Sequence, residues 1–216
     1  IIRTKMELLN SNVKWCAICG VIGPITFTIV VIALGLLQPA YNHAAQYVSE
    51  LGAMGAPNAI IMNIAGFSLL GILIIAFAPG LHFGINEGKG SKIGPGLLAV
   101  SGAGFIALGF FPCDSGCVNV SFTGLMHVVS ARVTWIGLIL ALLFIAQRFK
   151  SDPNWKSYRS YTLATALVTV IFALMLDFIG IEGWMGALQR VFLGVRLLWT
   201  EIIAIKLLRL SIRSSA

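Results

Sequence analysis

Apolar residues are gathered along this chain into six long runs separated by short polar segments. The runs cover residues 15–37, 58–83, 92–111, 122–146, 161–178 and 184–208. Each is about 18 to 26 residues long, and a helix needs about 20 apolar residues to cross a hydrocarbon core of roughly 30 Å. The pattern therefore predicts an all-α, polytopic integral membrane protein. We expect a single domain, a bundle of six transmembrane helices.

Basic residues alternate with the predicted helices. Of the 15 Lys and Arg residues, 12 lie before the first helix, in the second and fourth loops, and in the tail. The first, third and fifth loops contain none. Because positively charged loops stay in the cytoplasm, we expect a multi-pass protein of the cell membrane with both termini cytoplasmic. The 12 residues are Arg3, Lys5, Lys14, Lys89, Lys92, Arg148, Lys150, Lys156, Arg159, Lys206, Arg209 and Arg213.

The composition also indicates a membrane protein, and it limits the classes of molecule that the protein could bind. The chain is 58% hydrophobic and only 11% charged, against about 25% charged in soluble domains. Its net charge of +7 belongs to loops that meet anionic lipid headgroups. No basic stripe with interleaved aromatic residues is present, which argues against nucleic acid. Glycine patches, such as Gly102 with Gly104, also allow close helix contacts within the chain, in an oligomer or in a larger membrane complex.

The first loop, residues 38–57, is unusually long for a connector. Its apolar residues recur at spacings of three and four, which predicts a short amphipathic helix lying over the outer ends of the bundle. Such a helix is either a structural cap or a lid that contributes His43, Ser49 or Glu50. The apolar positions are Tyr41, Ala44, Ala45, Val48, Leu51 and Met54.

The third loop places Asp114 between Cys113 and Cys117. A disulfide is permitted outside the cytoplasm, and further Cys or His residues that a metal site would need do not follow. We therefore favour a disulfide between Cys113 and Cys117, and we predict no metal and no cofactor.

Polar side chains within the apolar runs are candidates for function, because burying them in a bilayer costs several kcal/mol unless they are paired or hydrated. In the fourth run, Thr123, His127, Ser130 and Thr134 share one helix face. Arg132 lies on another face, and we expect it to find a carboxylate inside the bundle.

The sixth run contains the charged residues Arg190, Arg196 and Glu201, with Lys206 near its end. Gln189 and Arg196 are seven apart and share a face, and Arg190 and Glu201 share another. We predict that Glu201 forms a buried ion pair with Arg132 or Arg196. The acidic residues of the outer loops, with His127, Gln189 and Arg190 just below them, would frame a polar cavity that faces outward.

The arrangement resembles the prokaryotic six-span membrane family named domain of unknown function 998. The resemblance rests on residues Tyr47-Val-Ser49-Glu50-Leu51-Gly52-Ala53 with Pro57 and Asn63. It also rests on Phe111-Pro112-Cys113-Asp114 with His127, and on Gln189-Arg190 with Leu198-Trp199 and Glu201. It covers about residues 15–208. It implies the six-helix architecture and no particular chemistry.

Three functions remain open. The first is binding or sensing, alone or as an accessory subunit: a lipid or small anionic ligand would be held in the outer cavity. Arginine binds phosphate and carboxylate in bidentate fashion. The expected binding residues are Glu50, Asp114, His127, Gln189, Arg190 and Arg196.

The second function is an intramembrane hydrolase. One version has Ser130 or Ser49 as nucleophile, His127 as base and Asp114 or Glu50 as the orienting acid. Another places a metal on His43, His127, Asp114 and Glu50 to activate water. The third function is a transporter of small solutes that depends on the buried charges Arg196 and Glu201. The sequence does not decide whether the protein is an enzyme.

Overall fold

The computed structural model describes residues 2–86, 88 and 91–213, with the backbone alone for residues 2–10. Lys89 and the side chains of Arg3 and Lys5, on which the orientation partly depends, lie outside the described residues. The described chain is mostly helical and contains no strand. The elements are α1 (Ile2–Leu37), η1 (Val48–Gly52), α2 (Ala59–Ile61), η2 (Met62–Ser68), α3 (Leu69–Gly84), α4 (Ile93–Phe110), η3 (Ser115–Cys117), α5 (Phe122–Ser151), η4 (Lys156–Tyr158), α6 (Arg159–Leu174), η5 (Met175–Ile179) and α7 (Met185–Arg213).

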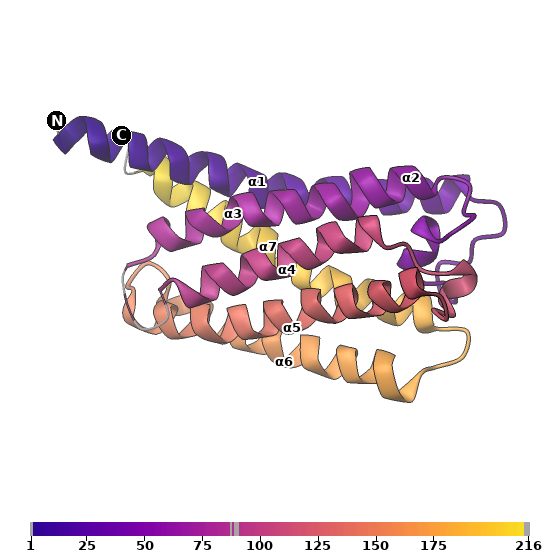
Figure 1. Ribbon diagram of the computed structural model, residues 1–216. Helices are drawn as coiled ribbons and strands as arrows, with labels where there is room; N and C mark the ends of the chain where they lie inside the picture. The colour runs from indigo at the N-terminus through magenta and orange to yellow at the C-terminus, as the bar shows by residue number, and fades with distance from the viewer. Residues whose placement is uncertain (1, 87, 89–90, 214–216) are drawn as a thin grey trace.

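Five helical segments are long and apolar enough to cross a membrane: Ser11–Leu37, Ala59–Gly84, Ile93–Phe110, Phe122–Ser151 and Lys156–Ile179. The sixth predicted span, α7, is not among them because it carries Arg190, Arg196 and Glu201. It is nevertheless 29 residues long, about 43 Å at 1.5 Å per residue, and it runs beside the other helices along the bundle (Figure 1). The chain is therefore a polytopic helical bundle of the membrane type.

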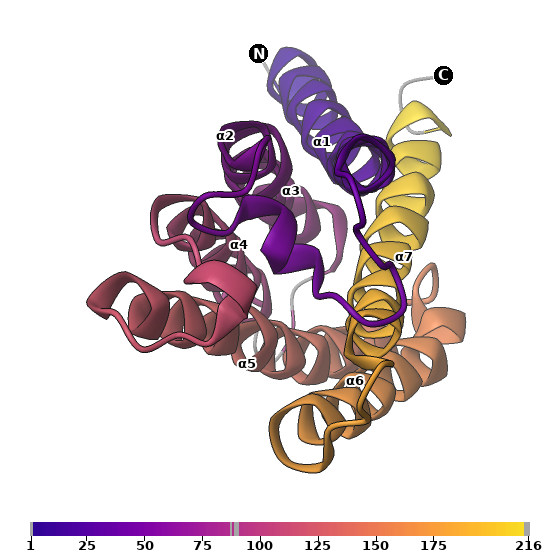
Figure 2. The ribbon, with the colours of Figure 1, turned by 90° about the vertical axis from the view of Figure 1, so that its right-hand side faces the viewer.

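The six long helices form a ring in chain order. Each packs against the helix that precedes it and the helix that follows it, and α7 closes the ring against α1. Figure 2 shows this arrangement along the bundle. The first turns of α1 and the last turns of α7 lie at the same end (Figure 1). At the opposite end, which we call the capped end, residues 38–58, 111–121 and 180–184 connect the helices.

A short helix in the first loop crosses the ring at the capped end (Figure 2). It is the five-residue 3-10 helix η1, shorter than the helix over residues 41–54 that the spacing predicted. Two of its apolar side chains, Val48 and Leu51, are at most 1% exposed. An amide of Asn63 in η2 donates to the carbonyl of Gly52 at 3.0 Å, which holds η1 against the bundle.

The physical reason for the shorter helix lies in residues 42–46. The side chain of Asn42 accepts the backbone N–H groups of Ala44 and Ala45, a local competitor to helix formation. The carbonyl of His43, which a helix would use internally, instead accepts a hydrogen bond from Arg190. The segment before η1 is therefore a series of turns.

The other end of the bundle is organised around Arg148, which is 1% exposed. Its guanidinium donates to the carbonyls of Leu81, His82, Ile85, Asn86 and Ser91. Asp152, at the end of α5, accepts the N–H of Asn86 at 2.9 Å. Together these bonds tie the end of α3, residues 85–86 and Ser91 to α5.

Candidate functional site

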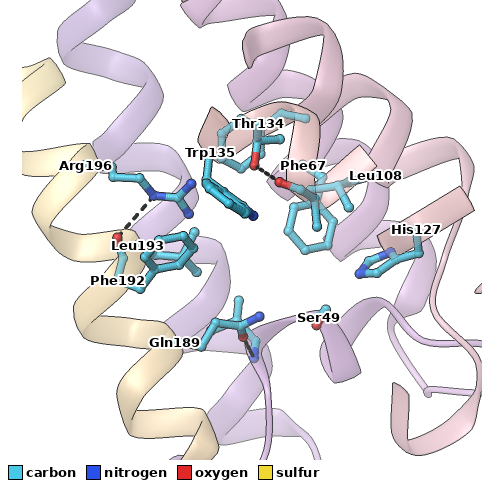
Figure 3. A pocket seen from close by; sticks show the side chains of 13 residues that line it. Ser49, Phe67, Leu108, His127, Thr134, Trp135, Gln189, Phe192, Leu193 and Arg196 are labelled. Carbon is cyan, nitrogen blue, oxygen red and sulfur yellow. Dashed lines mark hydrogen bonds between the residues drawn. The ribbon is translucent and has the colours of Figure 1, made fainter. Parts of the chain in front are cut away.

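A small cavity, which we call the chamber, lies beneath η1 inside the ring. It has a volume of about 60 Å³. Most of its wall is apolar, and its polar side chains come from η1, α5 and α7 (Figure 3). It is lined by Val48, Ser49, Phe67, Phe105, Leu108, His127, Ala131, Thr134, Trp135, Gln189, Phe192, Leu193 and Arg196.

A second, more open cavity adjoins the chamber at the capped end, and we call it the vestibule. It has a volume of about 170 Å³. Its wall combines α5, η5 and α7 with the first and third loops. It shares Ser49, His127, Ala131, Trp135 and Gln189 with the chamber, so the two cavities are direct neighbours. The other residues are Tyr47, Cys117, Asn119, Val128, Arg132 and Asp177.

Arg196 occupies one side of the chamber and is only 5% exposed. Its Nε donates to the carbonyl of Phe192 at 3.1 Å, and its guanidinium carbon lies 3.9 Å from the centre of the Phe192 ring. Within the described part of the chain, neither terminal nitrogen has a hydrogen-bond partner and no carboxylate is within ion-pair distance. Figure 3 shows the guanidinium directed into the chamber.

His127 faces Arg196 from the opposite side of the chamber (Figure 3) and is 7% exposed. Its Nδ1 lies 2.8 Å from the carbonyl oxygen of Phe111. A carbonyl can only accept, so Nδ1 carries the hydrogen, and in the neutral ring Nε2 keeps its lone pair. Phe111 follows the end of α4, where helix carbonyls lack intrahelical partners. The fold thereby sets the tautomer of His127.

Two further N–H donors border the chamber. Oε1 of Gln189 accepts the backbone N–H of Val48 at 2.6 Å, which leaves the amino group of that amide for the chamber. Within the described residues, nothing accepts a hydrogen bond from this amino group or from the indole N–H of Trp135. Among the described residues that line the chamber, none carries a carboxylate. Its polar side is therefore cationic and rich in donors.

Arg190, predicted to bind ligand, instead holds the first loop. It donates to the carbonyls of His43 at 2.6 Å, Gln46 at 3.0 Å and Gly186 at 3.0 Å, and to the hydroxyl of Tyr41 at 2.7 Å. It borders an apolar groove of about 310 Å³ between α1 and α7, and it does not line the chamber.

Glu50 and Asp114, the acidic residues predicted to bind ligand, instead accept hydrogen bonds from residues of their own loops. The carboxylate of Glu50 accepts the N–H of Tyr47 at 2.8 Å and an amide hydrogen of Gln46. Asp114 accepts the hydroxyl of Ser121 at 2.6 Å and its N–H at 2.8 Å. These bonds from Ser121, the hydroxyl first, lower the pKa of Asp114 from its ordinary value. Neither carboxylate lines the chamber or the vestibule.

The buried charges pair differently from the sequence prediction. Arg132 lies 3.6 Å from Asp177 in η5, at the rim of the vestibule, and its side chain is 54% exposed. Glu201 is the partner of neither arginine in the described structure. Residues five apart on a helix point about 140° away from each other, which places Glu201 on a different face from Arg196. Asp177 reaches Arg132 because α6 packs beside α5.

Cys113 and Cys117 form a disulfide bond. The pair lies over η1, with Sγ of Cys117 at 3.5 Å from Oγ of Ser49. Within the described residues, no three His, Cys, Asp or Glu side chains gather in the manner of a metal site. His43 borders the groove between α1 and α7, apart from His127.

The hydrolase arrangement is not assembled either. Ser130 is 4% exposed and lines none of the three cavities described here. Ser49 and His127 both line the chamber, but no hydrogen bond joins them in the described structure.

The family model described as "Protein of unknown function (DUF998)" matches residues 21–206. The chain belongs to this family. No curated protein and no solved structure matches it. Three of the residues on which the resemblance rested in this DUF998 protein, Ser49, His127 and Gln189, come together at the chamber and vestibule.

Sequence reasoning missed Trp135 and Phe192 as site residues. A signal for both was present. His127, Ala131, Thr134 and Trp135 are spaced four, three and one, and Gln189, Phe192, Leu193 and Arg196 are spaced three, one and three. Each set is one face of a helix, and each face lines the chamber.

Proposed function

We propose that this protein binds a small anionic group, the carboxylate or phosphate of a small molecule or of a lipid headgroup, in the chamber. One observation carries the proposal. Arg196 is 5% exposed, lacks a carboxylate partner among the described residues, and presents its terminal nitrogens to the cavity. A protein with this site would act in binding or sensing, alone or as an accessory subunit.

The energetics favour an anion at this position. A buried charge without a counter-charge costs several kcal/mol. The contact of Arg196 with the Phe192 ring offsets about 0.5 to 2 kcal/mol of that. A bound carboxylate or phosphate would offset far more, since a guanidinium donates to either in a two-pronged geometry. The free N–H groups of Gln189 and Trp135 would complete the anion's hydrogen bonds.

The size of the chamber limits what enters it. A volume of about 60 Å³ has room for roughly four water molecules, at about 10 to 15 Å³ each by this measure. One carboxylate or phosphate group is of that size. The remainder of a larger ligand would occupy the vestibule.

We also propose that the capped end faces outward in the cell membrane, so that ligand arrives from outside the cytoplasm. Support comes from charge. Lys92, Arg148 and Lys150 lie at the end opposite the cap, and positively charged segments stay in the cytoplasm. A fluorescent protein fused after α7 is expected to fluoresce in the cytoplasm. Periplasmic export of an alkaline phosphatase fused there would overturn the orientation.

The binding proposal is tested by native mass spectrometry of the detergent-purified protein, with lipid extraction from the same sample. We expect wild type to carry an anion or anionic lipid in one-to-one ratio, or to take up added phosphate or acetate. Arg196→Met should lose it. The matched control is Arg209→Met, which removes an exposed arginine from the same helix. Ligand retained in Arg196→Met, or a wild type that binds no anion, would contradict the proposal.

A further inference from the structure

His127 and Arg196 face each other across the chamber (Figure 3). A ligand between them would have to accept hydrogen bonds from Arg196 and donate one to His127. Arg196 offers only hydrogens, so it requires oxygen lone pairs. In the neutral ring of His127, the nitrogen on the chamber side offers only a lone pair, because the carbonyl of Phe111 holds the hydrogen on Nδ1. Within the described residues, no N–H or O–H group donates to that nitrogen.

The two ends of the chamber therefore differ in the hydrogen-bonding groups that they offer to a ligand. The Arg196 side, with Gln189 and Trp135, contributes N–H donors that have no acceptor in the described part of the chain. Thr134 adds little, because its hydroxyl already donates to the carbonyl of Ala131 at 2.6 Å. An anion without hydrogens would satisfy the donors and then set an oxygen lone pair against the lone pair of His127. A buried acceptor left without a donor costs about 1 to 3 kcal/mol.

We infer that the chamber selects an anion that carries its own hydrogen, such as hydrogen phosphate, over an anion of the same shape that carries none, such as sulfate. The inference rests on the proposed function and names the ligand chemistry of the same site. The O–H group of the anion donates to Nε2 of His127, and its remaining oxygens accept from Arg196, Gln189 and Trp135.

Phosphate and sulfate are the matched probes, because both are tetrahedral and of similar size, and at about pH 8 only phosphate keeps a hydrogen. Imidazole in most proteins is neutral at that pH. Isothermal titration calorimetry on the purified protein in nanodiscs of zwitterionic lipid would measure both dissociation constants. We expect phosphate to bind about 10- to 100-fold more tightly than sulfate, the factor that corresponds to one unsatisfied buried acceptor.

Two variants assign the selectivity to His127. His127→Phe keeps an aromatic ring and removes the acceptor, so the preference for phosphate should fall to within about threefold of unity. Thr134→Val is the matched control, since it changes a chamber residue of the same helix whose hydroxyl is already engaged. It should keep the wild-type preference. If His127→Phe does not fold, the ratio measured on wild type still decides the matter.

The outcomes separate the inference from the proposed function. Equal binding of both anions, or tighter binding of sulfate, overturns the inference and leaves anion binding in place. If neither anion binds to protein that has been freed of co-purified lipid, the inference and the proposed function are both overturned. Nanodiscs that include phosphatidic acid distinguish the source of the phosphate. A lipid headgroup in the chamber lowers the apparent affinity for inorganic phosphate, and a free anion as natural ligand leaves it unchanged.

Discussion

The side-chain oxygen of Gln189 accepts the backbone N–H of Val48 at 2.6 Å, across 141 residues of sequence. This bond ties α7 to the 3-10 helix that covers the chamber. Because the oxygen faces Val48, the amino group of the same amide is left for a ligand. One side chain thus holds the cover and contributes to the site.

Gln189→Glu should separate these two roles. A carboxylate still accepts the N–H of Val48, so the melting temperature should stay within a few degrees of wild type. The variant loses the amino donor and places a negative charge beside the chamber. We expect binding of inorganic phosphate to weaken at least 10-fold, measured by titration calorimetry. Gln189→Leu is the comparison: it should lose stability as well as affinity, and a Gln189→Glu protein with undiminished affinity would exclude Gln189 from the site.

Arg190 and Arg196 lie two turns apart on α7 and should respond differently to removal. Arg190 holds the carbonyls of His43, Gln46 and Gly186. Arg190→Ala leaves the carbonyl of His43 without a donor among the described residues and removes one of the donors to Gln46 and Gly186, and we expect a loss of about 1 to 3 kcal/mol of stability. Limited proteolysis should then cut residues 38–47 faster. Arg196→Met should change cleavage of that loop little and remove anion binding, and the reverse result would exchange their roles.

Ser121 and Asp114 make the folding stability of the capped end depend on pH. Ser121 caps α5 by accepting the N–H of Gly124 at 3.0 Å, and its hydroxyl lowers the pKa of Asp114 below the ordinary value of 3.8. A lowered pKa stabilises the fold above the ordinary value, and this contribution is lost as pH falls through the folded pKa. Asp114→Asn should therefore be less stable than wild type at neutral pH.

The stability difference between Asp114→Asn and wild type should shrink below about pH 4. Thermal unfolding of both proteins at several pH values would measure it. Ser121→Ala serves as the companion variant. It should cost about 1 kcal/mol at neutral pH through loss of the helix cap. A difference between wild type and Asp114→Asn that does not change with pH would contradict the assignment.

Arg148 should be the most sensitive position at the uncapped end. Within the described residues, its guanidinium donates to five backbone carbonyls, which belong to the last turn of α3 and to the segment between α3 and α4. Arg148→Leu leaves several of these buried acceptors unsatisfied, and each such group costs about 1 to 3 kcal/mol. We expect a loss of at least about 3 kcal/mol, measured as reduced yield and melting temperature. Lys150→Leu, which changes an exposed residue of the same helix, is the control and should be near neutral.

Hydropathy was sufficient to predict the helices, because a bilayer imposes one length and one polarity on every span. It placed α5 and α7 within a few residues of their observed positions. Helical periodicity also placed His127 and Thr134 on one face, and Gln189 and Arg196 on another, and all four line the chamber.

The partners of the charged residues could not be predicted. Arg190, predicted to bind ligand, and Arg148, predicted to lie in a cytoplasmic loop, donate to backbone carbonyls, which every residue possesses and no pattern marks. For the same reason Glu50 and Asp114 were assigned to a ligand, although backbone N–H groups of their own loops occupy them. Whether an ionisable side chain serves the fold or a ligand depends on loop conformation, which periodicity does not describe.

The hydrogen bonds that Arg190 donates to carbonyls of the first loop do not depend on pH. Carbonyl oxygens do not titrate, and an arginine stays protonated at every physiological pH. A cover fastened by an arginine and an aspartate would loosen in acid, when the aspartate takes up a proton. The hydrogen bonds from Arg190 to these carbonyls therefore keep their strength from acidic surroundings to alkaline ones.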